Sequence, residues 1–463
     1  MSQPPIILPV STVQNDFESL ITDVKDGIVP EETFWVSCYK TGEESVHGKV
    51  RLALSEQDRD LVEYGGHGGV TLTGNDTKRE YTVACPSLGI PPTKVAVPAR
   101  TYADPLPQVR PDVYRKISAF DVAPDGSQFA TGYDDGSIYI ASATSPTAPP
   151  SLARRVHLSS VTSVRFFPSS RVLLSAGADF ALHILPAEPP AAPSASAPSS
   201  DPVRIAPVRT LKGHTRAVTA TAIIARGRSV LSGAKDATLR LWDVSAGAQL
   251  RILGTAGWRP VLALAAGVRG EGAFVAPPDG DAAADTATAA EPVAPDPREV
   301  ETADKVVFAA LADGTFQAFD LGTKLSVFHS RGGGAALHSI AYSPDHNLVA
   351  TGSSVGIVDV YDTRSLDRPL LTFQRNEACV EDLAFIPLSP SAGNTEVGLA
   401  IATEDGLPFV ANVRPEGPSV LAELVGTDCD AVRSVKVGST PGTVWTAGDD
   451  GVVRRYEGLK ALS

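Results

Sequence analysis

Hydrophobic and polar residues alternate along the chain in short runs that return at a regular interval. A run with the pattern hydrophobic-x-x-hydrophobic-x-hydrophobic-x-proline occurs at residues 117–124, 161–168, 337–344 and 380–387. Alternation with a period of two is typical of β-strands that have one buried face. Each run leads to a turn, a second apolar run ending near Gly or Ala, an acidic turn and a third run. We therefore expect repeated antiparallel β-sheet units between Ile117 and Glu457.

The acidic turns give the period of this repeat. Successive turn positions lie 44, 57, 77, 42, 50 and 45 residues apart, and most of these intervals are close to one propeller blade of roughly 40 to 45 residues. The two longest intervals contain Pro/Ala-rich segments near 186–202 and 270–304, which we expect to be disordered insertions. Seven copies predict seven blades, whose turn residues are Asp135, Asp179, Asp236, Asp313, Val355, Asp405 and Asp450.

The fullest copy runs from Leu211 to Asp243 and resembles the WD40 repeat. Its His214, Ser232, Asp236 and Trp242 have the spacing of the structural tetrad of WD40 blades. The resemblance implies that Asp accepts a hydrogen bond from His and that Ser connects His to the Trp indole. We therefore expect this set to stabilise a turn and not to catalyse a reaction.

A second copy repeats the tetrad in part, with His157, Ser175 and Asp179, and has Leu185 where Trp would stand. A sheet of this kind cannot bury both faces alone, so copies must stack around a ring. The predicted fold class is all-β, a seven-bladed WD40 β-propeller with a small strand-rich N-terminal domain.

The first 92 residues lack the repeat and predict that separate small domain. We expect its strands at residues 33–38, 48–54, 69–73 and 79–84, and a turn over Gly65–Gly69. The propeller then occupies residues 93–463. Because few residues follow the third strand of the last copy, we expect residues 93–97 to supply the strand that closes the ring.

The formal charge of −13 comes mainly from the two insertions. Residues 270–304 contribute −8 and residues 186–202 contribute −2, which leaves −3 for the rest of the chain. No basic stripe with interleaved aromatic residues is present, so we expect no nucleic acid partner. The 4 cysteines are far apart and lack CxxC spacing, which favours reduced and mostly packed thiols: Cys38, Cys85, Cys379 and Cys429.

The chain has no apolar run of about 18 residues and no signal peptide at its start. We therefore expect no membrane association and a location in the cytoplasm and nucleus. The histidines lack HExxH or similar spacing, so we expect no metal and no cofactor.

One motif suggests an enzyme. Gly352-Ser-Ser354-Val-Gly356 fits G-x-S-x-G, the nucleophile elbow of serine hydrolases. That elbow must join a strand to a helix, whereas residues 357–361 alternate as a strand. We therefore predict that the protein is not an enzyme and that no residue is catalytic.

Beyond the repeat, the chain resembles the proteasomal ATPase-associated factor family. The matching stretches are Phe34–Cys38, Phe166–Ser169, Arg298–Val300, Asp428–Asp430 and Asp450–Tyr456. The resemblance implies a non-enzymatic chaperone for assembly of the base of the proteasome regulatory particle. It would bind the C-terminal domain of one proteasomal ATPase subunit through the loop face of the propeller. We expect the chaperone to be a monomer on its own.

The resemblance also implies that acidic loop residues contact a basic partner. Asp134, Glu404 and Asp449 precede the turn aspartates, align with Lys235 and are expected to point outward. Trp258 is an aromatic residue that the repeat does not explain. The complete candidate set for partner binding is Asp134, Trp258, Glu377, Glu381, Glu404, Asp428, Asp430 and Asp449.

Three alternatives stay open for the function. The propeller could be a general WD40 scaffold or a substrate receptor of a ubiquitin ligase, and a serine hydrolase centred on Ser354 is the remote third. Each acid of the candidate set could also be a solvated surface charge, and Trp258 could pack under the neighbouring insertion.

Overall fold

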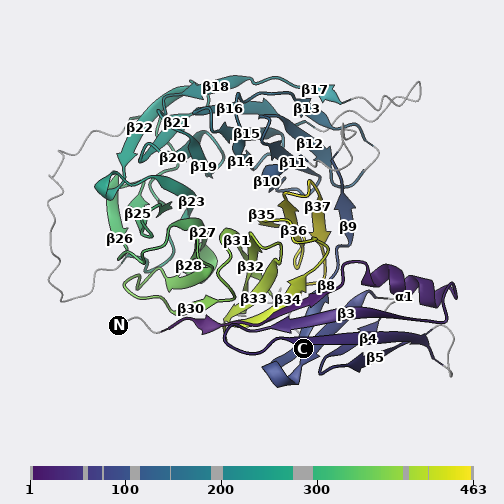
Figure 1. Cartoon of the computed structure of the whole chain (residues 1–463). Helices are drawn as coiled ribbons and strands as arrows, with labels where there is room; N and C mark the ends of the chain where they lie inside the picture. Colours follow the sequence, from purple (N-terminus) through teal and green to yellow (C-terminus); the bar gives the residue numbers. More distant parts are fainter. Residues whose placement is uncertain are drawn as a thin grey trace, which may run out of the picture.

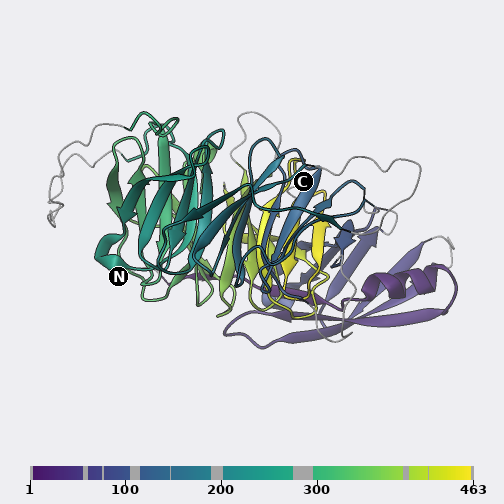
Figure 2. The same ribbon diagram turned by 90° about the horizontal axis from the view of Figure 1, so that it is seen from above.

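A ring of β-sheets surrounds a central channel, and a smaller unit built from the N-terminal residues lies against one side of the ring (Figure 1). The computed structural model describes residues 4–55, 61–75, 78–104, 115–145, 148–188, 202–274, 296–388, 396–414 and 417–459. Viewed from above, the ring is a disc and the N-terminal unit extends its edge (Figure 2).

The inner wall of the ring is made by the first strand of each sheet. Each of these strands contacts the next one, and the last contacts the first, so the ring is closed. We number the sheets as blades 1 to 7 in chain order. Their inner strands are β10 (Ile117–Val122), β14 (Val161–Phe166), β19 (Val218–Ile224), β23 (Val261–Val268), β27 (Leu337–Ser343), β31 (Val380–Pro387) and β35 (Val432–Val437).

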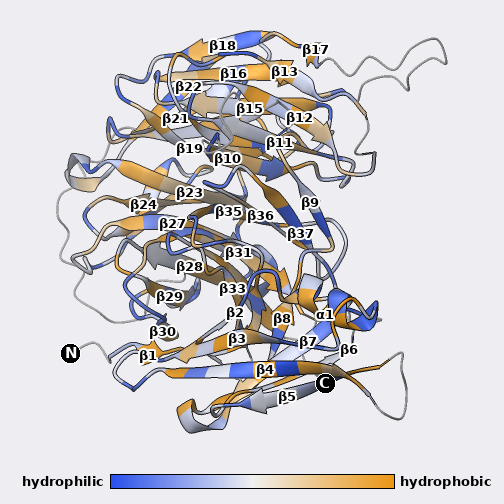
Figure 3. Ribbon diagram, turned by 45° about the vertical axis from the view of Figure 1, so that its right-hand side comes forward, coloured by the Kyte–Doolittle hydropathy of each residue, from blue (hydrophilic) through white to orange (hydrophobic). Residues whose placement is uncertain are grey.

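The second strand of each blade is almost wholly buried, because neighbouring blades cover both faces of the sheet. Apolar residues accordingly follow the strands of the ring (Figure 3). These second strands are β11 (Gln128–Tyr133), β15 (Val172–Gly177), β20 (Ser229–Ala234), β24 (Lys305–Leu311), β28 (Leu348–Ser353), β32 (Val397–Thr403) and β36 (Val444–Gly448). The third strands are β12 (Ile138–Ser142), β16 (Ala181–Pro186), β21 (Thr238–Asp243), β25 (Phe316–Asp320), β29 (Ile357–Asp362), β33 (Phe409–Arg414) and β37 (Val453–Tyr456).

The outermost strand of each blade is more exposed than the second strand, except in blade 1, where it is buried. In blades 1 to 6 it is β13 (Ser151–Ala153), β18 (Arg209–Lys212), β22 (Ala248–Gly254), β26 (Leu325–His329), β30 (Leu371–Gln374) and β34 (Ser419–Leu424). Two short strands lengthen the outer edge, since β17 (Val203–Arg204) pairs with β13 and β1 (Ile6–Ile7) pairs with β30, both in parallel. Two 3₁₀ turns, η2 (Ala256–Trp258) and η3 (Pro344–His346), lie in loops.

Blade 7 obtains its outer strand from before the first repeat. This strand is β9 (Arg100–Tyr102), which runs antiparallel to β37 with Thr101 opposite Arg454. Tyr102 then stacks on Trp445 at a centroid distance of 5.7 Å, in the hydrophobic cluster that joins blade 7 to blade 1. Aromatic side chains therefore pack across the junction between blades 7 and 1, where the propeller closes.

The prediction that residues 93–97 close the ring is wrong. They fall in and just after β8 (Ile90–Ala96), which pairs in parallel with β34 of blade 6. Val95 is fully buried in the hydrophobic core of the N-terminal unit, so this strand is held there. The closing strand begins only a few residues later, at Arg100.

The N-terminal unit has its own hydrophobic core. Its antiparallel sheet contains β2 (Val10–Val13), β3 (Glu31–Tyr39), β4 (Val46–Leu54) and β5 (Val62–His67). The strands β6 (Thr71–Asn75) and β7 (Glu80–Cys85) and the 3₁₀ turn η1 (Pro86–Leu88) lead to β8. Because β8 pairs with both β7 and β34, this unit continues the sheet of blade 6.

Two features of the N-terminal unit differ from the sequence-based expectation. An α-helix, α1 (Phe17–Lys25), packs on the sheet through Phe17, which contacts Phe34 and Tyr81 at centroid distances of 5.7 and 5.1 Å. The expected turn over residues 65–69 is also shorter. Strand β5 continues to His67, and only Gly68 and Gly69 turn the chain, with positive φ angles of 78° and 86°.

The two insertions are ordered at their ends. Residues 189–201 and 275–295, on which the expectation of disorder mainly rests, lie outside the described residues. The expectation is wrong for residues 270–274 and 296–304. Phe274 packs on Phe308 at a centroid distance of 6.0 Å, and Glu299 forms an ion pair with Arg251.

A buried ion pair joins the N-terminal unit to blades 5 and 6. Arg375 and Glu423 are paired, and their side chains are only 4% and 6% exposed. The Arg375 guanidinium also donates to the backbone oxygen of Pro9 at 3.0 Å, and Glu423 accepts the backbone N–H of Ser11 at 2.9 Å. The pair therefore ties β2 to the ring.

Helices are short throughout the part of the chain that the structure describes, and none there is long and apolar enough to cross a bilayer.

Replacing Glu423 by Ala should lower the free energy of unfolding by about 3 to 5 kcal/mol, because the Arg375 charge would stay buried without a partner. Chemical denaturation followed by tryptophan fluorescence measures the loss. The double variant Arg375→Met with Glu423→Leu should lose less free energy of unfolding than the sum of the losses in the single variants Arg375→Met and Glu423→Leu. Additive losses would contradict direct coupling of the two side chains.

Candidate functional site

The tetrad residues of blade 3 form a continuous chain of hydrogen bonds. Trp242 Nε1 donates to Ser232 Oγ at 2.8 Å, Ser232 Oγ and His214 Nε2 are 2.7 Å apart, and His214 Nδ1 lies 2.9 Å from Asp236 Oδ2. With a neutral imidazole protonated on Nδ1, every hydrogen in this chain has an acceptor. The chain links β20 and β21 to the loop before blade 3 and leaves no nucleophile free.

The protonation states support this arrangement. Burial lowers the pKa of His214 although Asp236 opposes the shift, so the imidazole stays neutral. Burial opposes the ionised form of Asp236, but hydrogen bonds from Thr238, the Thr215 N–H and His214 outweigh it and lower the pKa of that carboxyl. Neutral histidine beside ionised aspartate is the state in which the tetrad is fully hydrogen-bonded.

Blade 2 contains the same network without the tryptophan. His157 Nδ1 lies 2.9 Å from Asp179 Oδ1, and His157 Nε2 lies 2.9 Å from Ser175 Oγ. His183 pairs with Ser175, as Arg240 pairs with Ser232 in blade 3, and its ring lies 4.6 Å from that of His157. Burial, together with the neighbouring His157, lowers the pKa of His183 to about 4.

Each inner strand has a β-bulge at its second residue. In blade 1, for example, Ile117 pairs with Tyr133 and Ala119 with Gly132, so Ser118 is the extra residue. The same shift occurs in the other six blades. A bulge turns a side chain out of the strand's regular alternation. The bulged residues line one cavity of about 220 Å³ in the central channel, and we call them the channel ring: Ser118, Thr162, Thr219, Leu262, His338, Glu381 and Arg433.

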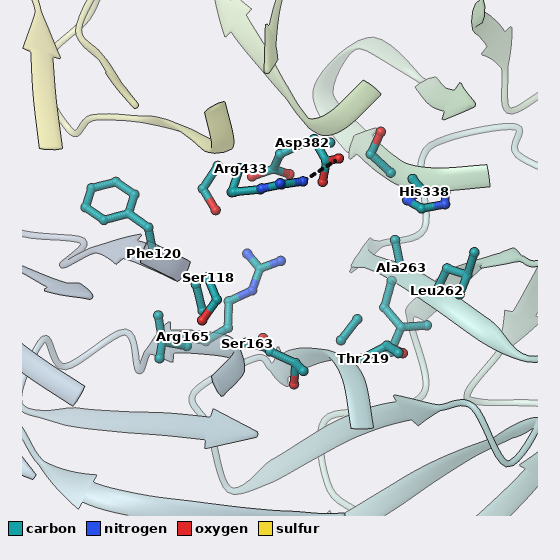
Figure 4. Close-up of a pocket in the computed structure, with 18 of the residues that line it drawn as sticks. Ser118, Phe120, Ser163, Arg165, Thr219, Leu262, Ala263, His338, Asp382 and Arg433 are labelled. Atoms are coloured by element: carbon teal, nitrogen blue, oxygen red, sulfur yellow. Dashed lines mark hydrogen bonds and ion pairs between the residues drawn. The ribbon is translucent and has the colours of Figure 1, made fainter. Parts of the chain in front are cut away.

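The channel ring has a structural half and a charged half (Figure 4). In blades 1 to 3 the hydroxyl of the bulged residue donates to a backbone oxygen of the next blade. Ser118 reaches Val161 at 2.7 Å, Thr162 reaches Val218 at 2.6 Å, and Thr219 reaches Val261 at 2.8 Å. In blades 5 to 7 the position holds His338, Glu381 and Arg433. These three residues cannot repeat the hydroxyl contact, so the sequence departs there from the structural pattern.

Two of the candidate partner-binding acids are neutralised inside this charged half. Arg433 donates to Glu381 Oε1 at 2.9 Å and to both oxygens of Asp449 at 3.0 and 2.9 Å. Lys116 of blade 1 approaches Asp449 at 2.8 Å. The prediction that Asp449 points outward is therefore wrong, because its side chain is only 9% exposed and pairs with two cations.

The pKa values reflect this network. Burial raises the pKa of Glu381, although Arg433 opposes the shift. Burial works in the same direction on Asp449, but hydrogen bonds from Arg433 and Lys116 outweigh it and lower the pKa of that carboxyl. The network joins blades 6, 7 and 1 and stabilises the mouth of the channel.

The remaining candidate acids are exposed on one face of the ring. We define the loop face as the face that carries the loops between second and third strands and the loops between blades. Asp134 accepts a hydrogen bond from Ser160 Oγ at 2.8 Å. The other four lie in blade 6 and the loops on either side of it, and we call them the acidic sector: Glu377, Glu404, Asp428 and Asp430.

Trp258 lies away from the acidic sector, in the loop between blades 3 and 4. Its side chain is 74% exposed, and its backbone has a positive φ of 54°. The exposure shows that the described residues do not cover the indole.

A groove next to the acidic sector was missed by sequence reasoning. It has a volume of about 550 Å³ and lies between the N-terminal sheet and blade 6. Trp35 and Tyr39 of β3 line one wall and remain 53% and 40% exposed, while Leu407 and Asp428 line the other. Trp35 belongs to a stretch that the sequence singled out, but only the folded chain brings it beside Asp428.

The G-x-S-x-G motif has no nucleophile-elbow geometry. Ser354 lies in the turn between β28 and β29, and its N–H donates to the backbone oxygen of Ala336 at 2.8 Å. A strand and not a helix follows the serine.

The four cysteines are free thiols; Cys38, Cys85 and Cys379 are buried and Cys429 is exposed.

Replacing Asp236 by Ala should destabilise the protein by about 1.5 to 3 kcal/mol, because His214, Thr238 and the Thr215 N–H would lose a charged acceptor. Thermal unfolding measures the effect. The matched change Asp313→Ala removes a turn aspartate that contacts no histidine among the described residues, and it should cost less. Equal losses would contradict the tetrad role.

Stability should fall as the pH drops from about 6.5 toward 4. His157, His183 and His214 all have pKa values below the ordinary histidine value, so the unfolded chain binds protons in this range that the folded chain does not. Each such histidine contributes a slope of at most about 1.4 kcal/mol per pH unit. Denaturation at a series of pH values measures the slope, and His183→Gln should reduce it. A slope that His183→Gln leaves unchanged would contradict this assignment.

Comparison with known proteins agrees with the geometry. The model of the WD40 family, described as WD domain, G-beta repeat, matches residues 113–141, 151–184 and 205–243. These segments fall in blades 1 to 3, where the tetrad residues and the structural half of the channel ring lie. No curated protein sequence matches the chain. The predicted all-β, propeller-like fold class is confirmed, and three segments of the chain match the WD40 repeat.

Proposed function

We propose that the protein is a non-enzymatic scaffold that binds another polypeptide on its loop face, at the acidic sector and the adjoining groove. WD40 repeats are typical of protein-interaction scaffolds, and the rigid ring presents its loops without rearrangement. The observation that carries the proposal is the juxtaposition of exposed carboxylates with an aromatic-walled groove that shares Asp428.

The acidic sector differs from the acids of the channel mouth in what surrounds it. Glu381 and Asp449 are held by Arg433, whereas no described cation pairs with Glu377, Glu404, Asp428 or Asp430. Their charges therefore project into solvent from three neighbouring loops. Such a field attracts a basic surface and orients it before contact.

The groove can supply the apolar part of the contact. Trp35 and Tyr39 are large side chains with exposed rings, and aromatic residues in pockets commonly carry much of the binding energy of an interface. A suitable partner segment would present an apolar side chain to the groove and Lys or Arg to the acidic sector.

The finer proposal concerns the identity of the partner. The resemblance of stretches such as Phe34–Cys38 and Asp428–Asp430 to the proteasomal ATPase-associated factor family supports a role as an assembly chaperone. In this role the protein binds the C-terminal domain of one proteasomal ATPase subunit. Both stretches border the groove, since Trp35, Asp428 and Cys429 line it.

A pull-down with the full chain against the isolated C-terminal domains of all proteasomal ATPase subunits tests the finer proposal. Selective capture of one domain is the expected result. Capture of none would remove the proteasomal assignment and leave only the general scaffold.

Replacing Glu404 by Gln and Asp428 by Asn should slow association with the captured domain roughly tenfold at low ionic strength, and the effect should shrink with added salt. Association rates at several salt concentrations measure this. The matched control is Asp345→Asn with Asp367→Asn, which removes two exposed acids from loops on the opposite face. Equal slowing by both double variants would point to net charge and contradict a localised site.

A further inference from the structure

We propose that His338, Cys379 and Glu381 form a binding site for a divalent transition-metal ion of the Zn²⁺ type at the mouth of the channel. One ligand atom from each of these side chains lies within 4.8 Å of the others. Imidazole nitrogen, thiolate sulfur and carboxylate oxygen are the donors that Zn²⁺ accepts in proteins.

The fold brings the three residues together through the repeat itself. His338 and Glu381 are the bulged residues of β27 and β31, which are neighbouring inner strands. The bulges turn both side chains into the same cavity. Cys379 directly precedes β31, and its backbone oxygen accepts the Glu404 N–H at 3.0 Å, which fixes the residue in place.

The positions are unusual for this ring. The residues that correspond to His338 and Glu381 in blades 1 to 3 are Ser118, Thr162 and Thr219, whose hydroxyls join one blade to the next. Blade 5 makes its link to blade 6 with Ser339 instead, which donates to Val380 O at 2.9 Å. His338 is therefore not needed for the blade-to-blade hydrogen bond that the bulged residue makes in blades 1 to 3.

The surroundings suit a bound cation of moderate affinity. A thiol binds a metal ion as the thiolate, so binding at Cys379 should release a proton and strengthen with rising pH. Arg433 holds one oxygen of Glu381 and orients the carboxylate, although its positive charge opposes a second cation.

The three-residue cluster is open to solvent on the side of His338. His338 is exposed at the channel mouth, while Cys379 is buried and Glu381 is half-buried. The described groups therefore supply three protein ligands and leave room for water or a partner side chain. A bound ion would join blade 5, through His338, to blade 6, through Cys379 and Glu381. The site lies beside the acidic sector, because the backbone oxygen of Cys379 accepts the N–H of Glu404.

The other histidine cluster of the molecule makes a useful contrast. His157, Asp179 and His183 also lie within ligand distance of one another. Both ring nitrogens of His157 are already engaged by Asp179 and Ser175, and His183 Nδ1 lies 3.0 Å from Thr210 Oγ1. A metal there would have to break the blade 2 network, so we assign that cluster a structural role.

Titration of the full chain with Co²⁺ and with Zn²⁺ tests the proposal. We expect one ion per chain, a thiolate-to-cobalt charge-transfer band, and release of a proton on binding. Cys379→Ser should abolish the band, and His338→Gln should weaken binding by about tenfold or more. The matched control Cys429→Ser removes the exposed thiol and should leave binding unchanged.

Circular dichroism shows whether each variant is folded. His338 is exposed, so His338→Gln keeps the test decisive even if Cys379→Ser unfolds. Absence of stoichiometric binding would overturn the proposal. So would binding that His338→Gln leaves unchanged, or that Cys429→Ser removes.

Discussion

The burial of both faces of every blade is the constraint on which the structure depends. A hydrophobic cluster lies between each pair of neighbouring blades, and the cluster between blades 7 and 1 is completed by Tyr102 from β9. No blade could be stable alone, because both of its apolar faces would remain in water. The buried second strands of the blades therefore serve packing, and within the ring the loops and the bulged residues are available to contact other molecules.

The bulge at the second residue of each inner strand links this constraint to function. It takes one side chain per blade out of the packed interface and turns it into the channel. In blades 1 to 3 the hydroxyl of this side chain donates a hydrogen bond to the backbone of the next blade. In blades 5 to 7 the side chain is titratable or charged. The chemistry of the ring is therefore concentrated on one side, next to the acidic sector and the groove.

Local signals made much of the fold predictable. The spacing of Val161 to Pro168 and its counterparts located inner strands, and the distance from His214 to Asp236 located a side-chain pair that lies 2.9 Å apart in the structure. Such signals work because both residues belong to one repeat. The closing strand could not be found in this way, since Arg100–Tyr102 is three residues long and precedes the first repeat.

Contacts between different strands, within a blade and between blades, were the main source of error at the site. Asp449 has the sequence position of an outward-pointing residue, but Arg433 and Lys116 come from other strands and hold it. His338 and Cys379 likewise lack any metal-like spacing, because the repeat and the bulge bring them together. The groove depends on β2 and β3 packing beside blade 6, which no repeat pattern describes.

Hydrogen–deuterium exchange of the full chain, with and without an ATPase C-terminal domain selected in the pull-down, tests whether the loop face is the binding surface. We expect slower exchange in the loops at residues 375–381, 404–407 and 426–431 and in strand β3, where Trp35 and Tyr39 line the groove. Protection confined to the opposite face, in the loops at residues 344–347 and 363–370, would contradict it.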